Sequence, residues 1–376
     1  MPELQEVFRM ATQKIRPEPG ALERQFQGQR RRSARRKAAA VGLVAALAIV
    51  AGVIAVQASR ISGEDRSTTA GTGISTNGGP LFAVDGDGYG FTSDGSRLLV
   101  LTSRGGLVVD AASGEILRSV DAGPGDGPTG FSPDGDLFVT ARGCGQCDQG
   151  SPVQFLHTHV IQTSTGEELW DFRKACCFVA FSPDGRLLAL PYAGRTQVVD
   201  LGTGEPVNEF EAFGSFAFSP DGQQLVVGSG DEGVVARVFD VGELSDGRPV
   251  VTLHGDSADP SAIKFAWSPD GSTLVTSMNS PEASVWDAVT GERMLAVPSS
   301  TGRITSVAFA SEAGFLATGS SDGDAIVWDL SNGDAHPIAN RHIEMGDRDW
   351  LTVALSPDGT RLMASDASES TVWQIS

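Results

Sequence analysis

Phe131-Ser132-Pro133-Asp134-Gly135 is a five-residue motif that recurs at near-regular intervals along the chain. Four further copies keep the pattern and two degenerate copies complete the series: Phe181–Gly185, Phe218–Gly222, Trp267–Gly271 and Leu355–Gly359, then Phe91–Gly95 and Phe309–Gly314. The seven starts are separated by 40, 50, 37, 49, 42 and 46 residues. Repeats of this length indicate a four-stranded unit that must stack on its neighbours to bury its apolar faces.

Each copy of the motif has the composition of a tight turn between two strands. The apolar residue ends a strand that faces the core, Pro fixes φ, Asp caps the turn, and Gly takes the left-handed conformation. A short apolar strand such as Leu187–Leu190 follows. Forty-six glycines with only 7% aromatic residues agree with short strands joined by turns, so the fold is predicted to be all-β. We assign a structural role to the aspartates of the motif, Asp134, Asp184, Asp221, Asp270 and Asp358.

A second landmark ends the third strand of each unit. It reads Val-Trp-Asp at Trp286-Asp287 and Trp328-Asp329, Val-Trp-Gln at Trp373, and Val-Phe-Asp or Val-Val-Asp in three others. A turn such as Thr290-Gly291-Glu292 then leads into a fourth strand. At these Trp-Asp positions the chain resembles the WD40 repeat family over residues 81–376. The resemblance implies a seven-bladed β-propeller in which these Trp and Asp residues are structural.

The sequence also departs from the family's pattern. The Gly-His dipeptide of many WD40 blades is missing, and only His254-Gly255 occurs, in reversed order. Ser-Pro-Asp-Gly turns resemble those of TolB-like bacterial propellers as well. The resemblances to the WD40 family and to TolB-like proteins both imply a β-propeller. Six or eight blades are the alternatives to seven.

The two ends of the repeat region are predicted to close the ring. The last repeat stops at Ser376 after its third strand, while Leu81–Val84 forms an extra strand before the first repeat. Pairing of Leu81–Val84 with the last blade would supply the missing outer strand and remove an exposed edge.

Residues 38–58 are predicted to form a transmembrane helix. Ala38–Gln57 carries no charge and, at ~1.5 Å per residue, is long enough for the ~30 Å hydrocarbon core. Cations concentrate before it, at Arg30, Arg31, Arg32, Arg35, Arg36 and Lys37. The positive-inside rule then places residues 1–37 in the cytoplasm and the propeller, residues 81–376, outside the cell membrane. A signal peptide cleaved after Ala58 and a buried core helix are the alternatives. Residues 59–80, rich in Ser, Thr and Gly, are predicted to be a flexible linker.

The cytoplasmic segment, residues 1–37, has a pattern of its own. Apolar residues from Leu4 to Ile15 fall on one face of a predicted helix that ends at Pro17. The basic cluster of this segment is interpreted as a topology determinant near anionic lipid, and the alternative is that the apolar face is a docking helix for a cytoplasmic partner. Val7–Gln25 resembles the tails of actinobacterial membrane-anchored propeller proteins, some encoded beside alternative sigma factors. The resemblance implies an anti-sigma-like role with a sigma factor as partner.

Charge is unevenly distributed along the chain. Residues 1–37 carry ten basic and four acidic residues, which leaves 18 basic and 43 acidic residues, a net charge of −25, for the remainder. Repulsion excludes nucleic acid as a direct ligand of so acidic a domain, and anionic lipid headgroups likewise. The same acidity favours a basic protein partner.

The four cysteines, Cys144, Cys147, Cys176 and Cys177, fall in the second repeat or at the start of the third. Because thiols oxidise outside the cytoplasm, we predict structural disulfides, with three pairings open. One alternative is a metal site of Cys144 and Cys147 with His157 and His159, which share a strand face because they are two residues apart. Another is redox chemistry at the Cys-x-x-Cys, although such a motif normally opens a helix.

Three matches to ligand-binding or catalytic motifs are interpreted as turns. Gly228–Gly233 matches the dinucleotide fingerprint and Gly319–Gly323 the nucleophile elbow, but each precedes a predicted strand instead of a helix. Asp85–Gly88 suggests calcium, yet Tyr89 and Ser96 stand where an EF-hand needs an oxygen ligand and a Glu. The sequence therefore predicts no enzyme, no catalytic residue and no cofactor.

The expected function is a non-enzymatic, membrane-anchored protein-interaction scaffold. Its binding surface is predicted at the long loops, Gly143–Gln154, Gly255–Ser261 and His336–Asp349, because loops on rigid scaffolds carry recognition. The alternatives are a transmembrane, anti-sigma-like regulator and a propeller hydrolase or glycan-binding module.

Overall fold

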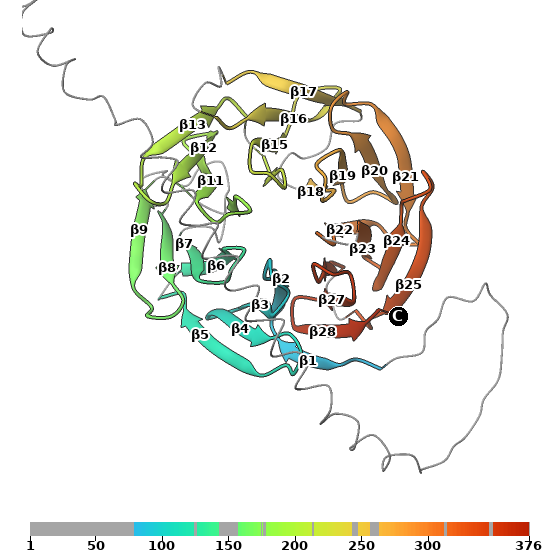
Figure 1. Cartoon of the computed structure of the whole chain (residues 1–376), viewed down its shortest axis with the longest axis horizontal. Helices are drawn as coiled ribbons and strands as arrows, with labels where there is room; N and C mark the ends of the chain where they lie inside the picture. The colour runs from blue at the N-terminus through green and yellow to red at the C-terminus, as the bar shows by residue number, and fades with distance from the viewer. Residues whose placement is uncertain are drawn as a thin grey trace, which may run out of the picture. The chain divides into compact units, whose positions relative to one another are not determined.

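Seven four-stranded antiparallel sheets form a ring around a central channel (Figure 1). The computed structural model describes residues 79–375 apart from 124–125, 143–156, 174, 176–177, 213, 243–246, 256–262, 312–313 and 346–348. The prediction of an all-β propeller with seven blades is confirmed. Among these residues no helix has the length and apolar character needed to cross a membrane, and the predicted helix 38–58 lies outside them.

The strands of each blade follow one another from the channel to the rim, and the blades are numbered in chain order from β2. The innermost strands are β2 (Asp87–Phe91), β6 (Asp126–Phe131), β10 (Ala180–Phe181), β14 (Phe216–Phe218), β18 (Lys264–Trp267), β22 (Ile304–Phe309) and β26 (Thr352–Leu355). The second strands are β3 (Arg97–Thr102), β7 (Leu137–Arg142), β11 (Leu187–Tyr192), β15 (Gln224–Gly228), β19 (Thr273–Ser277), β23 (Phe315–Ser320) and β27 (Arg361–Ser365). The third strands are β4 (Gly105–Asp110), β8 (His157–Gln162), β12 (Arg195–Asp200), β16 (Val234–Asp240), β20 (Glu282–Asp287), β24 (Asp324–Asp329) and β28 (Glu369–Gln374). The outer strands are β5 (Ile116–Asp121), β9 (Glu168–Arg173), β13 (Pro206–Phe210), β17 (Pro249–His254), β21 (Arg293–Pro298), β25 (His336–His342) and, for blade 7, β1 (Phe82–Asp85).

The ring is closed by the two ends of the repeat region, as predicted. Strand β1 pairs antiparallel with β28, from Phe82 opposite Val372 to Asp85 opposite Glu369 (Figure 1). Val84 is buried, in a cluster that includes Val100 of blade 1 and Met363 of blade 7. The first and last strands of the chain order therefore share one sheet, and this pairing removes a free edge at the junction.

The apolar core is divided among the contacts between blades. Each of the seven clusters of buried residues draws on two neighbouring blades. Between blades 1 and 2, for example, Leu99 and Val108 pack with Phe131 and Phe138, whose ring centroids are 4.9 Å apart. Burying one such aromatic side chain contributes about 2–3 kcal/mol. A single blade cannot bury its faces alone, which explains why the sequence repeats.

The Ser-Pro-Asp-Gly motifs form the turns between the first and second strands of their blades. In blade 2 the Ser132 hydroxyl donates to Asp134 Oδ1 at 2.6 Å, Asp136 N donates to the same oxygen at 3.0 Å, and Leu137 N donates to Ser132 Oγ at 2.9 Å. Gly135 has φ +72°, the left-handed conformation that favours glycine. The same hydroxyl-to-carboxylate hydrogen bond recurs at Asp184, Asp221, Asp270 and Asp358.

Turns of neighbouring blades approach one another, so they define one face of the ring. Ser93 N donates to Pro133 O at 2.8 Å, and a Cβ at Gly271 would lie 3.8 Å from Pro220. The turns after the third strands emerge on the same side, because successive strands in a blade are antiparallel. We call this side the corner face. The opposite side, where the second strand turns into the third and each blade connects to the next, is the loop face.

Two tryptophans of the second landmark make buried hydrogen bonds within their blades. Trp286 Nε1 donates to Thr276 Oγ1 and Trp328 Nε1 to Thr318 Oγ1, each at 2.9 Å. Trp373 is buried at the corresponding place in blade 7, where Ala364 replaces the threonine. The following aspartates cap turns on the corner face: Asp287 Oδ1 accepts from Val289 N and Thr290 N, and Asp329 Oδ1 from Ser331 N.

One predicted loop is wrong in part. His336–His342 is the outer strand β25, paired with β24 from Asp324 opposite His342 to Asp329 opposite His336. Its polar side chains are compatible with a strand because the outer strand of a blade faces solvent. The other two predicted binding loops, Gly143–Gln154 and Gly255–Ser261, lie largely outside the described residues.

Candidate functional site

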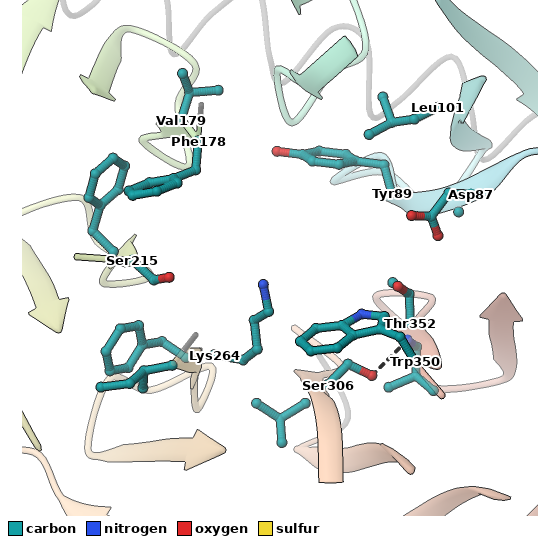
Figure 2. Close-up of a pocket in the computed structure, with 16 residues that line it drawn as sticks. Asp87, Tyr89, Leu101, Phe178, Val179, Ser215, Lys264, Ser306, Trp350 and Thr352 are labelled. Atoms are coloured by element: carbon teal, nitrogen blue, oxygen red, sulfur yellow. Dashed lines mark hydrogen bonds between the residues drawn. The ribbon is translucent and has the colours of Figure 1, made fainter. Parts of the chain in front are cut away.

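The loop-face end of the central channel holds a cavity of about 390 Å³. Apart from Leu101 on the second strand β3, the described lining residues lie in inner strands or just before them, and they come from six of the seven blades. Figure 2 shows Lys264 projecting into this space from one side, with Trp350, Asp87 and Tyr89 on the other. The repeats thus bring together side chains that are remote in sequence.

Among the described residues that line the cavity, Lys264 is the one cation, and the start of strand β18 fixes its position. The residue before it, Ile263, is fully buried between blades 4 and 5, and Lys264 itself pairs with Ser277 on β19. Burial of the ammonium group lowers the pKa of Lys264, and the Asp87 carboxylate partly opposes that shift. The cavity therefore holds a partly desolvated positive group on a rigid strand.

Trp350 lies beside Lys264, on the connection from blade 6 to blade 7. The Lys264 Nζ atom is 5.1 Å from the centroid of the indole ring, within the range of a cation–π contact. Two hydroxyls of blade 6 fix the chain that follows Trp350: Thr305 Oγ1 donates to Leu351 O at 2.8 Å, and Val353 N donates to Ser306 Oγ at 3.1 Å. Blade 6 thereby fixes the backbone next to Trp350, whose indole lies beside a lysine of blade 5.

Tyr89 occupies the side of the cavity nearest blade 2. Its hydroxyl lies close to the backbone of β6, and a Cβ at Gly130 would come within 2.8 Å of that oxygen. A glycine is therefore required at position 130 for this approach. Phe178 and Phe216, on the opposite wall, are in edge contact with ring centroids 5.5 Å apart.

The arrangement of these side chains is suited to binding. In the described part of the lining, one cation, one carboxylate and several aromatic faces surround a space large enough for a protein side chain. An acidic group entering the cavity would meet Lys264, and the aromatic walls would contact its apolar stem.

The residues predicted as site residues have different positions. Cys144, Cys147, Cys176 and Cys177 lie outside the described residues, as do the cations Arg30 to Lys37. His157 and His159 lie on β8, away from the cavity lining. The three motif-like turns are hairpins or strand junctions: Gly228–Gly233 joins β15 to β16, Gly319–Gly323 joins β23 to β24, and Asp85–Gly88 joins β1 to β2.

Sequence reasoning missed Lys264 and Trp350. Each stands outside the recurring motifs, and 85 residues separate the two in the chain. A signal was present, since Lys264 is a charged residue at the start of an inner strand. Only the ring geometry shows that the start of an inner strand faces the channel.

Comparisons with known proteins agree with the propeller fold. Residues 292–329 match the family model "WD domain, G-beta repeat". Telomerase protein component 1 of Rattus norvegicus is 25% identical over 236 residues, covering 57% of this chain and 9% of that protein. Denticleless protein homolog of Danio rerio is 29% identical over 118 residues, covering 31% of this chain and 18% of that protein. The chain thus matches less than a fifth of the length of either relative.

Among solved structures, a chain in the crystal structure of the mitotic checkpoint complex superposes with a TM-score of 0.62. The match covers 83% of this chain and all of the other, at 16% identity, so it concerns the fold. The chain is a seven-bladed β-propeller. Within it, residues 292–329 match a WD40 repeat that begins with β21 of blade 5 and ends with β24 of blade 6. WD40 propellers are mostly non-enzymatic scaffolds that bind protein partners.

Proposed function

We propose that this protein is a non-enzymatic interaction scaffold that receives a protein partner at the loop face of its propeller. The observation that carries the proposal is the cavity at the channel end, where Lys264 lies over Trp350 on a rigid ring. The cation lies within an acidic domain, so it offers a local site for an acidic side chain of a partner whose wider surface is basic.

The proposal includes a membrane anchor. Residues 38–58 would span the cell membrane, residues 1–37 would lie in the cytoplasm, and the linker of residues 59–80 would carry the propeller on the outer side. The uncharged stretch Ala38–Gln57 and the cations before it support this topology. In cells expressing the full chain, external protease should digest the propeller and leave a tag at residue 1 intact. Digestion of the tag and protection of the propeller would reverse the orientation.

Photo-crosslinking in intact membranes tests where the partner binds. A photoreactive residue at Ser215 would line the cavity, and the same residue at Val289, which is 77% exposed on the corner face, is the matched control. We expect a protein adduct from position 215 and little from position 289. Adducts formed only at position 289 would contradict binding at the loop face.

A second candidate function rests on the apolar face from Leu4 to Ile15. Under this alternative, residues 1–37 bind a sigma factor in the cytoplasm and the propeller senses an external ligand. A pull-down with residues 1–37 separates the two, because capture of a sigma factor supports the regulator, and binding to lipid alone supports the scaffold. Turnover or glycan binding by the full chain would instead favour a hydrolase or a glycan-binding module.

A further inference from the structure

Blade 2 carries a cluster of metal-ligating side chains apart from the channel cavity. His157 and His159 lie on the third strand, β8, and Asp171 on the outer strand, β9. His159 is directly opposite Asp171 in the register of the two strands, and His157 is the next residue on the same face. The antiparallel pair therefore presents all three side chains on one surface.

The three side chains are close enough to share one ion. Their candidate ligand atoms all lie within 4.8 Å of one another. Asp171 Oδ1 is 2.8 Å from His157 Nδ1 and 3.9 Å from His159 Nδ1. The two imidazole rings are nearly parallel, with centroids 5.8 Å apart and an interplanar angle of 11°. Donors around a tetrahedral zinc ion lie ~3.4 Å apart, given zinc–ligand distances of ~2.0–2.2 Å, so small side-chain rotations suffice.

His159 provides an independent reason to expect a ligand. Its side chain is only 13% exposed, and among the described residues neither ring nitrogen has a hydrogen-bond partner. Glu168 Oε2 approaches Nδ1 to 3.0 Å and Asp126 Oδ2 approaches Nε2 to 3.8 Å, but neither contact is a hydrogen bond. A buried imidazole without hydrogen bonds is costly, and coordination of a metal ion would satisfy one of its nitrogens.

The cluster in blade 2 contains two histidines, whereas another His–Asp pair of the propeller contains one. His342 of β25 contacts Asp324 of β24 through Nδ1 and Oδ1, also at 2.8 Å and also across an antiparallel strand pair. That pair forms no group of three ligands among the described residues. The His342–Asp324 pair is thus a natural control for the cluster in blade 2.

We propose that His157, His159 and Asp171 bind a divalent d-block cation of the zinc class. Two imidazole nitrogens and one carboxylate oxygen are ligands that Zn²⁺ accepts, and they leave a fourth position for water or for Glu168. Arg173 Nε, 3.6 Å from Asp171 Oδ2, would contact the carboxylate oxygen that faces away from His157. The ion would link β8 to β9 at the loop-face end of blade 2, since His157 is the first residue of β8.

Zinc titration of the purified full chain, followed by calorimetry, tests the proposal. We expect His157→Ala, His159→Ala and Asp171→Asn each to weaken zinc binding at least ~10-fold, as loss of one ligand does at such sites. His342→Ala should leave the affinity unchanged. Zinc binding that is equal in all four variants and the parent chain would overturn the proposal.

Cobalt substitution provides a second readout on the unmutated protein. Bound Co²⁺ should give visible d–d bands without sulfur-to-metal charge-transfer bands in the near ultraviolet. Thiolate charge-transfer bands would show that cysteines hold the metal and would overturn the assignment to His157, His159 and Asp171. This readout remains decisive even where a histidine variant fails to fold.

Discussion

The two faces of the ring are built in opposite ways. On the corner face, nearly the same turn recurs from blade to blade, and a serine hydroxyl donates to the motif aspartate in five of them at 2.6–2.7 Å. On the loop face, the connections differ in length and composition, and the cavity there combines a lysine, a tryptophan and a tyrosine that each occur once in it. The corner face is therefore built from turns that repeat between blades, and the loop face from connections that differ between blades.

This difference indicates how stability and recognition are divided. The corner face stabilises the ring by many small, equivalent contributions, so no single turn is decisive. In the function that we propose, the loop face concentrates recognition in a few side chains, above all Lys264 and Trp350, which contact each other in the cavity. Substitutions on the two faces should then affect different measurements.

Removing all the motif aspartates should have the largest effect on stability. Each carboxylate accepts hydrogen bonds from a hydroxyl and a backbone amide, and because these groups are largely exposed we assign each about 1 kcal/mol. Replacing Asp134, Asp184, Asp221, Asp270 and Asp358 by Ala should lower the free energy of unfolding by about 5 kcal/mol, measured by urea unfolding at neutral pH. Five exposed aspartates off the turns provide the control, and an equal loss there would contradict the role of the turns.

Acid should reproduce part of that loss. Hydrogen bonds from Ser182, Ser219, Ser268 and Ser356 lower the pKa of Asp184, Asp221, Asp270 and Asp358 respectively, below the unfolded value of about 3.9. Their contribution is complete above that unfolded pKa and is lost as the pH falls through the lower native values. Stability should therefore decline below about pH 4.

The five-alanine variant is the control for this pH dependence. Its unfolding free energy should change less steeply with pH than that of the parent chain, while a slope remains from Asp200, Asp287 and Asp329, whose pKa values hydrogen bonds also lower. Parallel slopes in the two proteins would show that the motif aspartates do not contribute.

Lys264→Met should affect binding and leave stability almost unchanged. The substitution keeps the apolar stem and removes a partly desolvated ammonium group, so we expect partner affinity to fall about 30-fold, equivalent to about 2 kcal/mol. The measurement is the dissociation constant for the partner recovered by crosslinking. Arg186→Met removes a corner-face cation that pairs with Asp200 and should leave this affinity unchanged. A comparable loss of partner affinity in both variants would contradict the assignment of binding to the loop face.

The sequence was sufficient to predict the repeated half of the molecule. The turns, the strand that follows each, and the closing strand at Leu81–Val84 could be predicted, because each depends on local chemistry that recurs. The turn Asn332-Gly333-Asp334 indicates a fourth strand after it, but the polar composition of His336–His342 favoured a loop, and its pairing with β24 shows that the register of the blade outweighs composition.

The candidate sites were predictable only in fragments. His157 and His159 were identified because they are two residues apart on one strand, but Asp171 joins them only through the pairing of β8 with β9. Trp350 contacts Lys264 only because blades 5, 6 and 7 are consecutive in a ring. Contacts between blades are set by tertiary geometry, which a pattern along the chain does not contain.

The smallest expected effect lies inside the blades, where the repetition is incomplete. Trp328 donates a buried hydrogen bond to Thr318, whereas in the blade of Trp373 the position equivalent to Thr318 is occupied by Ala364. Trp328→Phe should therefore lower the free energy of unfolding by about 1 kcal/mol more than Trp373→Phe, because both lose similar packing but only one loses a hydrogen bond. Trp286→Phe, which loses the bond to Thr276, should match Trp328→Phe in urea unfolding. Equal losses at all three positions would mean that the tryptophans stabilise the blades by packing alone, and that the blades are as equivalent inside as they are at their corners.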